Sequence, residues 1–186
     1  MREQHIKRER ATSNICTASA LMASMTGFYC VYNGPEGLRR AAETAHLAAA
    51  TVARALEAMD YRLASKEFFD TLEVEAEAAV VQSLALEQGI NFYYPSEGRV
   101  RMSFDEVTTA AEIETVVSIF AAAKGKKAKA VKAVTESCVP TALRRQSPYL
   151  QEPVFNAYRS ESALMRYIKK LELRDISLAN SMISLG

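Results

Sequence analysis

The residues best placed to do chemistry stand just before a helix that the sequence predicts near the N-terminus. Four of them carry hydrogen-bond donors on their side chains: Arg10, Thr12, Ser13 and Asn14. A helix N-terminus presents free backbone N–H groups, so donors placed there form a ready site for an anion such as phosphate. The same residue types are also ordinary N-caps, and on the chemistry alone we favour N-capping.

Other reactive residue types occur singly rather than in catalytic sets. The chain has 2 histidines, His5 and His46, which argues against a multi-histidine metal site and against a Ser-His-Asp triad. Cys16 adjoins the apolar stripe of a predicted helix with no base in sight, so we expect a buried, inert thiol rather than a nucleophile. His46 stands among alanines in a predicted helix, and we expect it to be packed or partly exposed.

The charged residues of two segments are expected to face solvent rather than to form a catalytic or binding site. Glu73 and Glu75 share one face of a strand predicted over residues 71–76, and outward-facing polar alternation accounts for both. A run of lysines is expected to form the solvated face of a helix, and it lacks the interleaved aromatic residues that nucleic-acid binding favours: Lys126, Lys127, Lys129 and Lys132. The 7 glycines are scattered at single turn positions, so no phosphate-binding loop is indicated.

Composition sets wider limits on the class of protein. The 186 residues suffice for one ordinary domain or two very small ones, and 49% hydrophobic with 24% charged residues is typical of a globular chain. A net charge of +1 gives no global attraction to nucleic acid or to an anionic membrane. No apolar run approaches the ~20 residues of a membrane span, and the N-terminus has no secretory signal. The 3 cysteines show no zinc spacing, so we expect reduced thiols in an intracellular protein. Together with the absence of a leader, this leads us to expect a protein of the bacterial cytoplasm.

Periodicity predicts the elements that must position these residues. One helical stripe runs through Ile15, Ala18, Met22, Met25, Tyr29 and Tyr32, and a second, alanine-rich stripe runs through Leu38, Ala42, Ala45, Ala49, Val52, Leu56 and Met59. Asn33-Gly34-Pro35 is expected to break the chain between them. A strand over 71–76 and a helix over 78–88 that ends at Gly89 follow.

The later elements complete an α+β pattern. Residues 90–94 are strand-like, a turn at Pro95–Gly98 closes a hairpin, and Thr109 with Glu112 forms a capping box before a helix that ends near Gly125. We expect a small antiparallel or mixed sheet with helices on one face. The predicted limits are an arm over 1–12, an α+β domain over 13–137, and an extended, proline-containing tail over 138–186 with one helix at about 160–173.

Two long segments resemble one known family. Residues 2–17, REQHIKRERATSNICT, and residues 149–186, from YLQEPVFNAYRSES to SMISLG, are similar to stretches of the glycine cleavage system P-protein. Residues 27–46 and 103–109 also match it. Members of this family are much longer and consist of two related halves, each with the aspartate-aminotransferase-like (fold type I) architecture. The resemblance implies the small C-terminal domain of the first half and the crossover into the second, and the abrupt apolar end fits a chain that continues in the family.

The family resemblance also implies an activity for the whole parent, a glycine dehydrogenase (decarboxylating). It decarboxylates glycine with pyridoxal phosphate and passes the aminomethyl group to the lipoyl arm of the H-protein. In the family the Schiff-base lysine follows a histidine, whereas here Ile6 follows His5 and Leu47 follows His46. We therefore expect a non-catalytic, structural portion that binds no cofactor and no metal by itself. Arg159 stands where histidine is common in the family.

The resemblance places a few residues near the parent's clefts. Ser13 and Asn14 are expected to line the cleft against the large domain of the first half, and Ser184 and Gly186 to approach the active site of the second half. Plain interdomain packing is the alternative for both pairs.

The expected partners follow from the same resemblance. They are the remainder of the P-protein and, for the parent, the lipoylated H-protein. Alone, the chain is expected to dimerise or to have a partly disordered tail, because the tail aromatics Tyr149, Phe155 and Tyr158 would lose their cover. The rival interpretation is a free-standing α+β interaction module that binds a partner through the Met22, Met25 and Tyr29 face or through the proline-rich tail. A nucleic-acid binder is disfavoured by the near-zero net charge.

Overall fold

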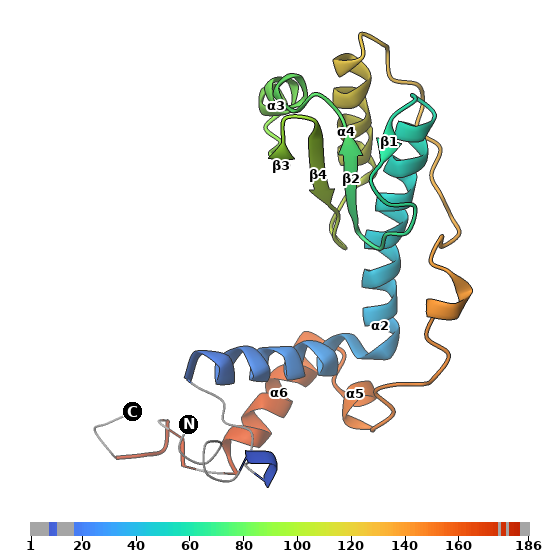
Figure 1. Cartoon of the computed structure of the whole chain (residues 1–186). Helices are drawn as coiled ribbons and strands as arrows, with labels where there is room; N and C mark the ends of the chain where they lie inside the picture. Colours follow the sequence, from blue (N-terminus) through green and yellow to red (C-terminus); the bar gives the residue numbers. More distant parts are fainter. Residues whose placement is uncertain (1–7, 11–16, 175, 178, 183–186) are drawn as a thin grey trace. The chain divides into compact units, whose positions relative to one another are not determined.

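The computed structural model describes residues 8–10, 17–174, 176–177 and 179–182. Its elements follow the chain in this order (Figure 1): η1 (Arg8–Arg10), α2 (Thr17–Glu57), β1 (Arg62–Leu63), β2 (Thr71–Glu75), α3 (Ala78–Glu87), β3 (Tyr93–Ser96), β4 (Arg99–Ser103), α4 (Ala110–Ala123), η2 (Thr141–Leu143), α5 (Val154–Ala157) and α6 (Glu161–Glu172). These elements fall into two compact units. The first unit holds the described residues up to Leu38 and from Pro148 onward, and the second unit holds Arg39–Ser147.

The second unit is built on a four-stranded antiparallel sheet of order β1-β2-β4-β3. Leu72 of β2 pairs with Met102 of β4, and Val74 pairs with Val100. All four side chains are buried, while the residues between them point to the opposite face, as a period of two requires. The α+β class and the strand predicted over 71–76 are thus confirmed.

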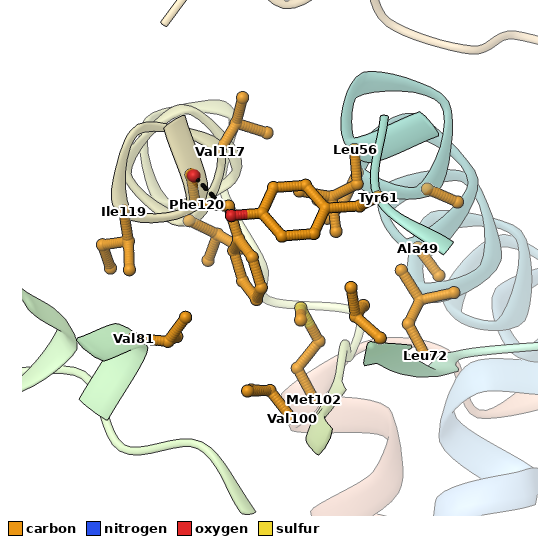
Figure 2. Close-up of a cluster of buried hydrophobic side chains, with 14 of the residues drawn as sticks. Ala49, Leu56, Tyr61, Leu72, Val81, Val100, Met102, Val117, Ile119 and Phe120 are labelled. Atoms are coloured by element: carbon orange, nitrogen blue, oxygen red, sulfur yellow. Dashed lines mark hydrogen bonds between the residues drawn. The ribbon is translucent and has the colours of Figure 1, made fainter. Parts of the chain in front are cut away.

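One hydrophobic core lies on that face of the sheet (Figure 2). Three helices contribute to it, and their most buried large side chains are Val52 and Leu56 of α2, Val81 of α3, and Val117 and Phe120 of α4. The expectation of helices on one face is therefore correct. Tyr61 closes the cluster: its ring meets Phe120 edge-on at 5.3 Å, and its hydroxyl donates a hydrogen bond of 2.8 Å to the Phe120 carbonyl oxygen.

Several local signals are confirmed in detail. Thr109 and Glu112 form both bonds of the capping box at the start of α4. Gly89 after α3 and Gly125 after α4 have φ values of +70° and +65°, the left-handed conformation that favours glycine at a helix C-terminus. The break expected at residues 33–35 is a kink inside α2, where Gly34 has φ 60° and ψ −178°.

The hairpin is shifted from its expected position. The strand predicted over residues 90–94 is β3 at Tyr93–Ser96, so Pro95 lies in a strand and the turn shrinks to Glu97-Gly98. β3 is an edge strand, where a proline that lacks an N–H need not break a ladder hydrogen bond. The strand therefore begins later and runs through the residue expected to end it.

The prediction of a helix for the lysine run is wrong. Residues 126–137 form neither helix nor strand. The chain leaves α4 through a tight turn in which the Lys126 N–H donates to the Ala121 carbonyl at 2.9 Å. Val134 then anchors this coil to α2, because its side chain is buried and its N–H donates a 3.0 Å hydrogen bond to Thr51 Oγ1. Closely spaced like charges also disfavour a helix here.

Other differences concern short elements. Three short elements were not expected: β1 with two residues, η2 with three and α5 with four. Segments this short are too few residues to show a hydrophobic period. Pro153 occupies the N-cap of α5, a position compatible with its fixed φ. The longer tail helix is confirmed: Ser160 caps α6 by accepting a 3.3 Å hydrogen bond from the Ala163 N–H.

Candidate functional site

None of the four residues expected to line the parent's clefts lies in the described part of the chain. Ser13, Asn14, Ser184 and Gly186 are all outside it, as is Cys16. Their placement near a cleft therefore stays a prediction. The described residues next to them in sequence belong to the first unit, so a candidate site is sought among the residues of that unit.

The described residues do not fit pyridoxal phosphate by themselves. That cofactor needs a lysine for the resting Schiff base and donors for its phosphate. Every lysine in the described part of the chain is exposed. Lys124 is already engaged, because its Nζ donates to the carbonyl oxygens of Met59 and Asp60 at 2.9 and 2.7 Å and lies 4.1 Å from the centre of the Tyr61 ring.

The two carboxylates on the open face of the sheet are not an acid–base pair. Glu73 accepts hydrogen bonds from Arg99 Nη1 at 2.6 Å and from Arg101 Nε at 2.9 Å. These two guanidinium groups, Arg99 first and then Arg101, lower the pKa of the Glu73 carboxyl. The expectation of a solvated Glu73 is corrected to a half-buried carboxylate in an ion-pair cluster, whereas Glu75 is exposed.

The first unit is organised around the kink in α2. The Arg159 guanidinium packs against Gly34, and a Cβ at residue 34 would lie 2.0 Å from its Nη2 and displace it. The same guanidinium donates to Asn156 Oδ1 at 3.1 Å. On the next residue, the Pro35 carbonyl accepts a 2.7 Å hydrogen bond from the Tyr149 hydroxyl. Two tail residues, more than a hundred positions away in sequence, thus contact the kink: Tyr149 through a hydrogen bond and Arg159 through packing.

The aromatic residues of the tail continue this packing. Tyr158 and Tyr167 stack with ring centres 4.1 Å apart, and Phe28 meets Tyr167 edge-on at 6.4 Å. The rings of Tyr149, Phe155 and Tyr158, which the sequence suggested would be uncovered, are half-buried. The expected full exposure of these three aromatics is therefore wrong: Tyr149 bonds to the Pro35 carbonyl of α2, and Tyr158 stacks on Tyr167 of α6.

The exposed apolar surface lies instead on α2 itself. The stripe predicted from Met22 to Tyr32 faces solvent, with Met22 61% and Met25 54% exposed, and Leu21 beside it is exposed as well. Val31, outside the stripe, is buried. Exposed apolar side chains gathered on one helix face are typical of a contact surface, and this α2 face is the candidate site.

Sequence reasoning found the stripe on α2 but not its orientation. Periodicity shows that residues share a face and does not show which partner covers that face. Arg159 and Tyr149 were also missed as clasps of the kink. The Asn33-Gly34-Pro35 sequence predicted the break, but no local pattern predicts which side chain of the distant tail packs against Gly34. Among the described residues, no helix combines the length and apolarity that crossing a bilayer requires.

The chain is similar to one well-defined group of proteins. The family model "Glycine cleavage system P-protein" matches residues 1–120. Proteins named glycine dehydrogenase (decarboxylating) from Flavobacterium johnsoniae and Christiangramia forsetii are 49% and 43% identical over 186 residues, which is 100% of this chain and 20% of each relative. The relative from Thermosynechococcus vestitus is 44% identical over 188 residues.

One solved structure supports the same relationship. The crystal structure of glycine decarboxylase (P-protein) of the glycine cleavage system, in inhibitor-bound form, superposes with a TM-score of 0.52 and 27% identity. The match covers 66% of this chain and 30% of that one. The chain therefore spans about a fifth of the length of its sequence relatives, 20% for the first of them.

Proposed function

The chain belongs to the glycine cleavage system P-protein family, and we propose that it works as the non-catalytic small domain of a longer glycine decarboxylase. The observation that carries the proposal is coverage: the whole chain aligns with relatives at up to 49% identity yet spans 20% of their length. A function that needs the other four-fifths belongs to the assembled protein rather than to this part.

The proposed whole-protein activity is the one that the relatives' name gives, decarboxylation of glycine. In it the parent uses pyridoxal phosphate, which would supply an electron sink for the electron pair left on carbon when carbon dioxide departs. The parent then passes the aminomethyl group to the lipoyl arm of the H-protein in the bacterial cytoplasm. The described lysines are exposed, so we assign the cofactor to the remainder of the parent. The fold type I architecture of each half is part of the same proposal.

The role of this chain is then to present a preformed surface to the remainder of the parent. The kink at Gly34 and the clasping side chains of the tail fix the first unit. They leave Met22 and Met25 exposed on α2, and burying such side chains stabilises an interface by roughly 1.5–3 kcal/mol each. We also retain Ser13, Asn14, Ser184 and Gly186 as proposed cleft residues of the parent.

A segment exchange tests the proposal. The Flavobacterium johnsoniae relative aligns with this chain over 186 residues, so the corresponding segment of that enzyme can be replaced by this chain. We expect the chimera to release carbon dioxide from carboxyl-labelled glycine in the presence of lipoylated H-protein. The chain alone should show neither turnover nor the absorbance of bound pyridoxal phosphate.

Two results would contradict the proposal. One is a folded chimera that binds the cofactor but does not turn over glycine, because the segment would then not be equivalent. The other is turnover by the chain alone. For the cleft residues, Ser184→Ala in the chimera should change the KM or kcat for glycine, and unchanged values of both would remove Ser184 from the site.

A further inference from the structure

A cavity in the second unit has no part in the proposed function. Its volume is about 580 Å³, and it lies between the end of α2, α4 and the coil that follows α4. That coil is anchored to α2, because the Val134 N–H donates to Thr51 Oγ1 at 3.0 Å, and it runs alongside the same helix in Figure 1. Cavities of this size are typical of small-molecule sites in proteins.

The floor of the cavity is apolar and borders the hydrophobic core. Ala55, Met59 and Val131 line it, and all three are half-buried and pack against the core. Val117 of α4, which is 2% exposed, lines it as well. Apolar side chains left half-exposed around a hollow favour the binding of an apolar group, because the group removes more of their surface from water.

The rim of the cavity is cationic. Four exposed side chains line it: Arg54 of α2, and Lys127, Lys129 and Lys132 of the coil. In the part of the chain that the structure describes, these four form no ion pair. A carboxylate placed among them would therefore meet uncompensated positive charge, and hydrogen bonds between charged groups are stronger than those between neutral ones.

The negative groups of this region do not cancel that charge. Among the described residues no carboxylate lines the cavity. Asp60 is paired with Lys126 at 3.3 Å, and Glu114 of α4 lines a separate hollow. The carbonyl oxygens at the end of α2 would repel an anion, but those of Met59 and Asp60 already accept hydrogen bonds from Lys124 Nζ. The cavity therefore combines an apolar floor with a positive rim.

We propose that this cavity binds a medium-chain fatty acid. The aliphatic chain lies on the apolar floor, and the carboxylate lies among Arg54, Lys127 and Lys132. An aliphatic body fits better than an aromatic one, because no aromatic side chain among the described residues lines the cavity to stack on a ring. The site uses no residue that the proposed function needs, so it does not depend on glycine turnover by the parent.

Titration of the whole chain with decanoate, below the concentration at which it forms micelles, tests the proposal. Decanol has the same chain without the charge, and acetate has the charge without the chain. Calorimetry gives the affinity, and the methyl NMR signals of Met59, Val117 and Val131 report where the ligand binds. We expect these signals to shift with decanoate and not with acetate. Octanoate should bind more weakly, because each fully buried CH₂ tightens binding by up to about fourfold.

Variants at exposed positions separate the two parts of the site. Lys127→Gln combined with Lys132→Gln should weaken decanoate binding roughly three- to tenfold and leave decanol unchanged. Lys66→Gln is the matched control, since Lys66 is an exposed lysine of the second unit that does not line the cavity. Added salt should act as the double variant does. Ala58→Trp places a large side chain at an exposed position of the lining and should abolish binding of both ligands.

Four results would overturn the proposal. The first is an absence of binding, and the second is a shift of the Met22 and Met25 signals in place of those of the cavity, which would assign the ligand to the exposed face of α2. The third is equal affinity for decanoate and decanol that neither salt nor the double lysine variant changes. The fourth is binding by the chain but not by the chimeric enzyme, because the remainder of the parent would then fill the cavity.

Discussion

Substituting Gly34 by alanine should destabilise the first unit strongly. Gly34 has φ 60° and ψ −178°, a conformation that is essentially restricted to glycine and costs another residue about 1–3 kcal/mol. The new Cβ would also lie 2.0 Å from Arg159 Nη2 and 2.6 Å from its Cζ. The guanidinium must move, and its hydrogen bond to Asn156 contributes about 0.5–1.5 kcal/mol. We expect a loss of about 2–4 kcal/mol in unfolding free energy.

Urea unfolding followed by far-ultraviolet circular dichroism measures this loss, and amide hydrogen exchange assigns it to the first unit. Gly27→Ala is the matched control in the same helix, because a Cβ at Gly27 meets nothing within 4 Å. There the change should stabilise the chain by about 0.5–1 kcal/mol, since alanine favours helix over glycine. A second background, Arg159→Ala, removes the clash and leaves the backbone cost alone.

If Gly34→Ala changes the unfolding free energy by no more than about 0.5 kcal/mol, the size of an ordinary surface substitution, the kink does not depend on glycine. If the loss is the same with and without Arg159, the guanidinium does not confine the site, and only the backbone argument survives.

Three further predictions address other parts of the chain. Glu73→Gln should reduce the pH dependence of stability: the folded pKa of Glu73 lies below its ordinary value of 4.5, so its contribution is complete above that value and is lost as the pH falls through the lower folded pKa. Urea midpoints at pH 6 and pH 3 check this, and an unchanged difference between them contradicts it. Tyr61→Phe removes the 2.8 Å bond to the Phe120 carbonyl and should cost about 1–2 kcal/mol in unfolding free energy; a change near zero would show that the bond contributes nothing net. Met25→Glu, on the exposed stripe of α2, should weaken any self-association of the chain seen by light scattering, while an unchanged mass distribution would place the contact elsewhere.

The elements that the sequence predicted best are those with a local physical cause. The capping box of Thr109 and Glu112, the glycine after α3 and the alternation in β2 each depend on residues within a few positions of one another. The hairpin was displaced because Pro95 signals a turn locally, whereas its place at a sheet edge is a property of the whole sheet. The family membership was readable because two long segments matched.

The contacts that sequence did not predict join distant residues. The residues around Gly34 do not predict its contact with Arg159, and the residues around Cys138 do not predict its contact with His46. The packed histidine was expected, but its partners were not. The lysine run misled because Lys126, Lys129 and Lys132 recur at three-residue steps, as on one face of a helix. The buried Val134, which anchors the coil, lies outside the run.

The borders of the sheet have a consequence for how this chain can aggregate. One outer strand, β1, has two residues, and the other, β3, contains Pro95. Short or proline-containing edge strands offer few free N–H and C=O groups to a neighbouring chain. Growth by strand addition is thus disfavoured at both edges, so oligomers of this chain should assemble through side chains on helices. Such oligomers should keep the helical circular dichroism of the monomer, should not bind thioflavin T, and should dissolve on dilution rather than seed fibrils.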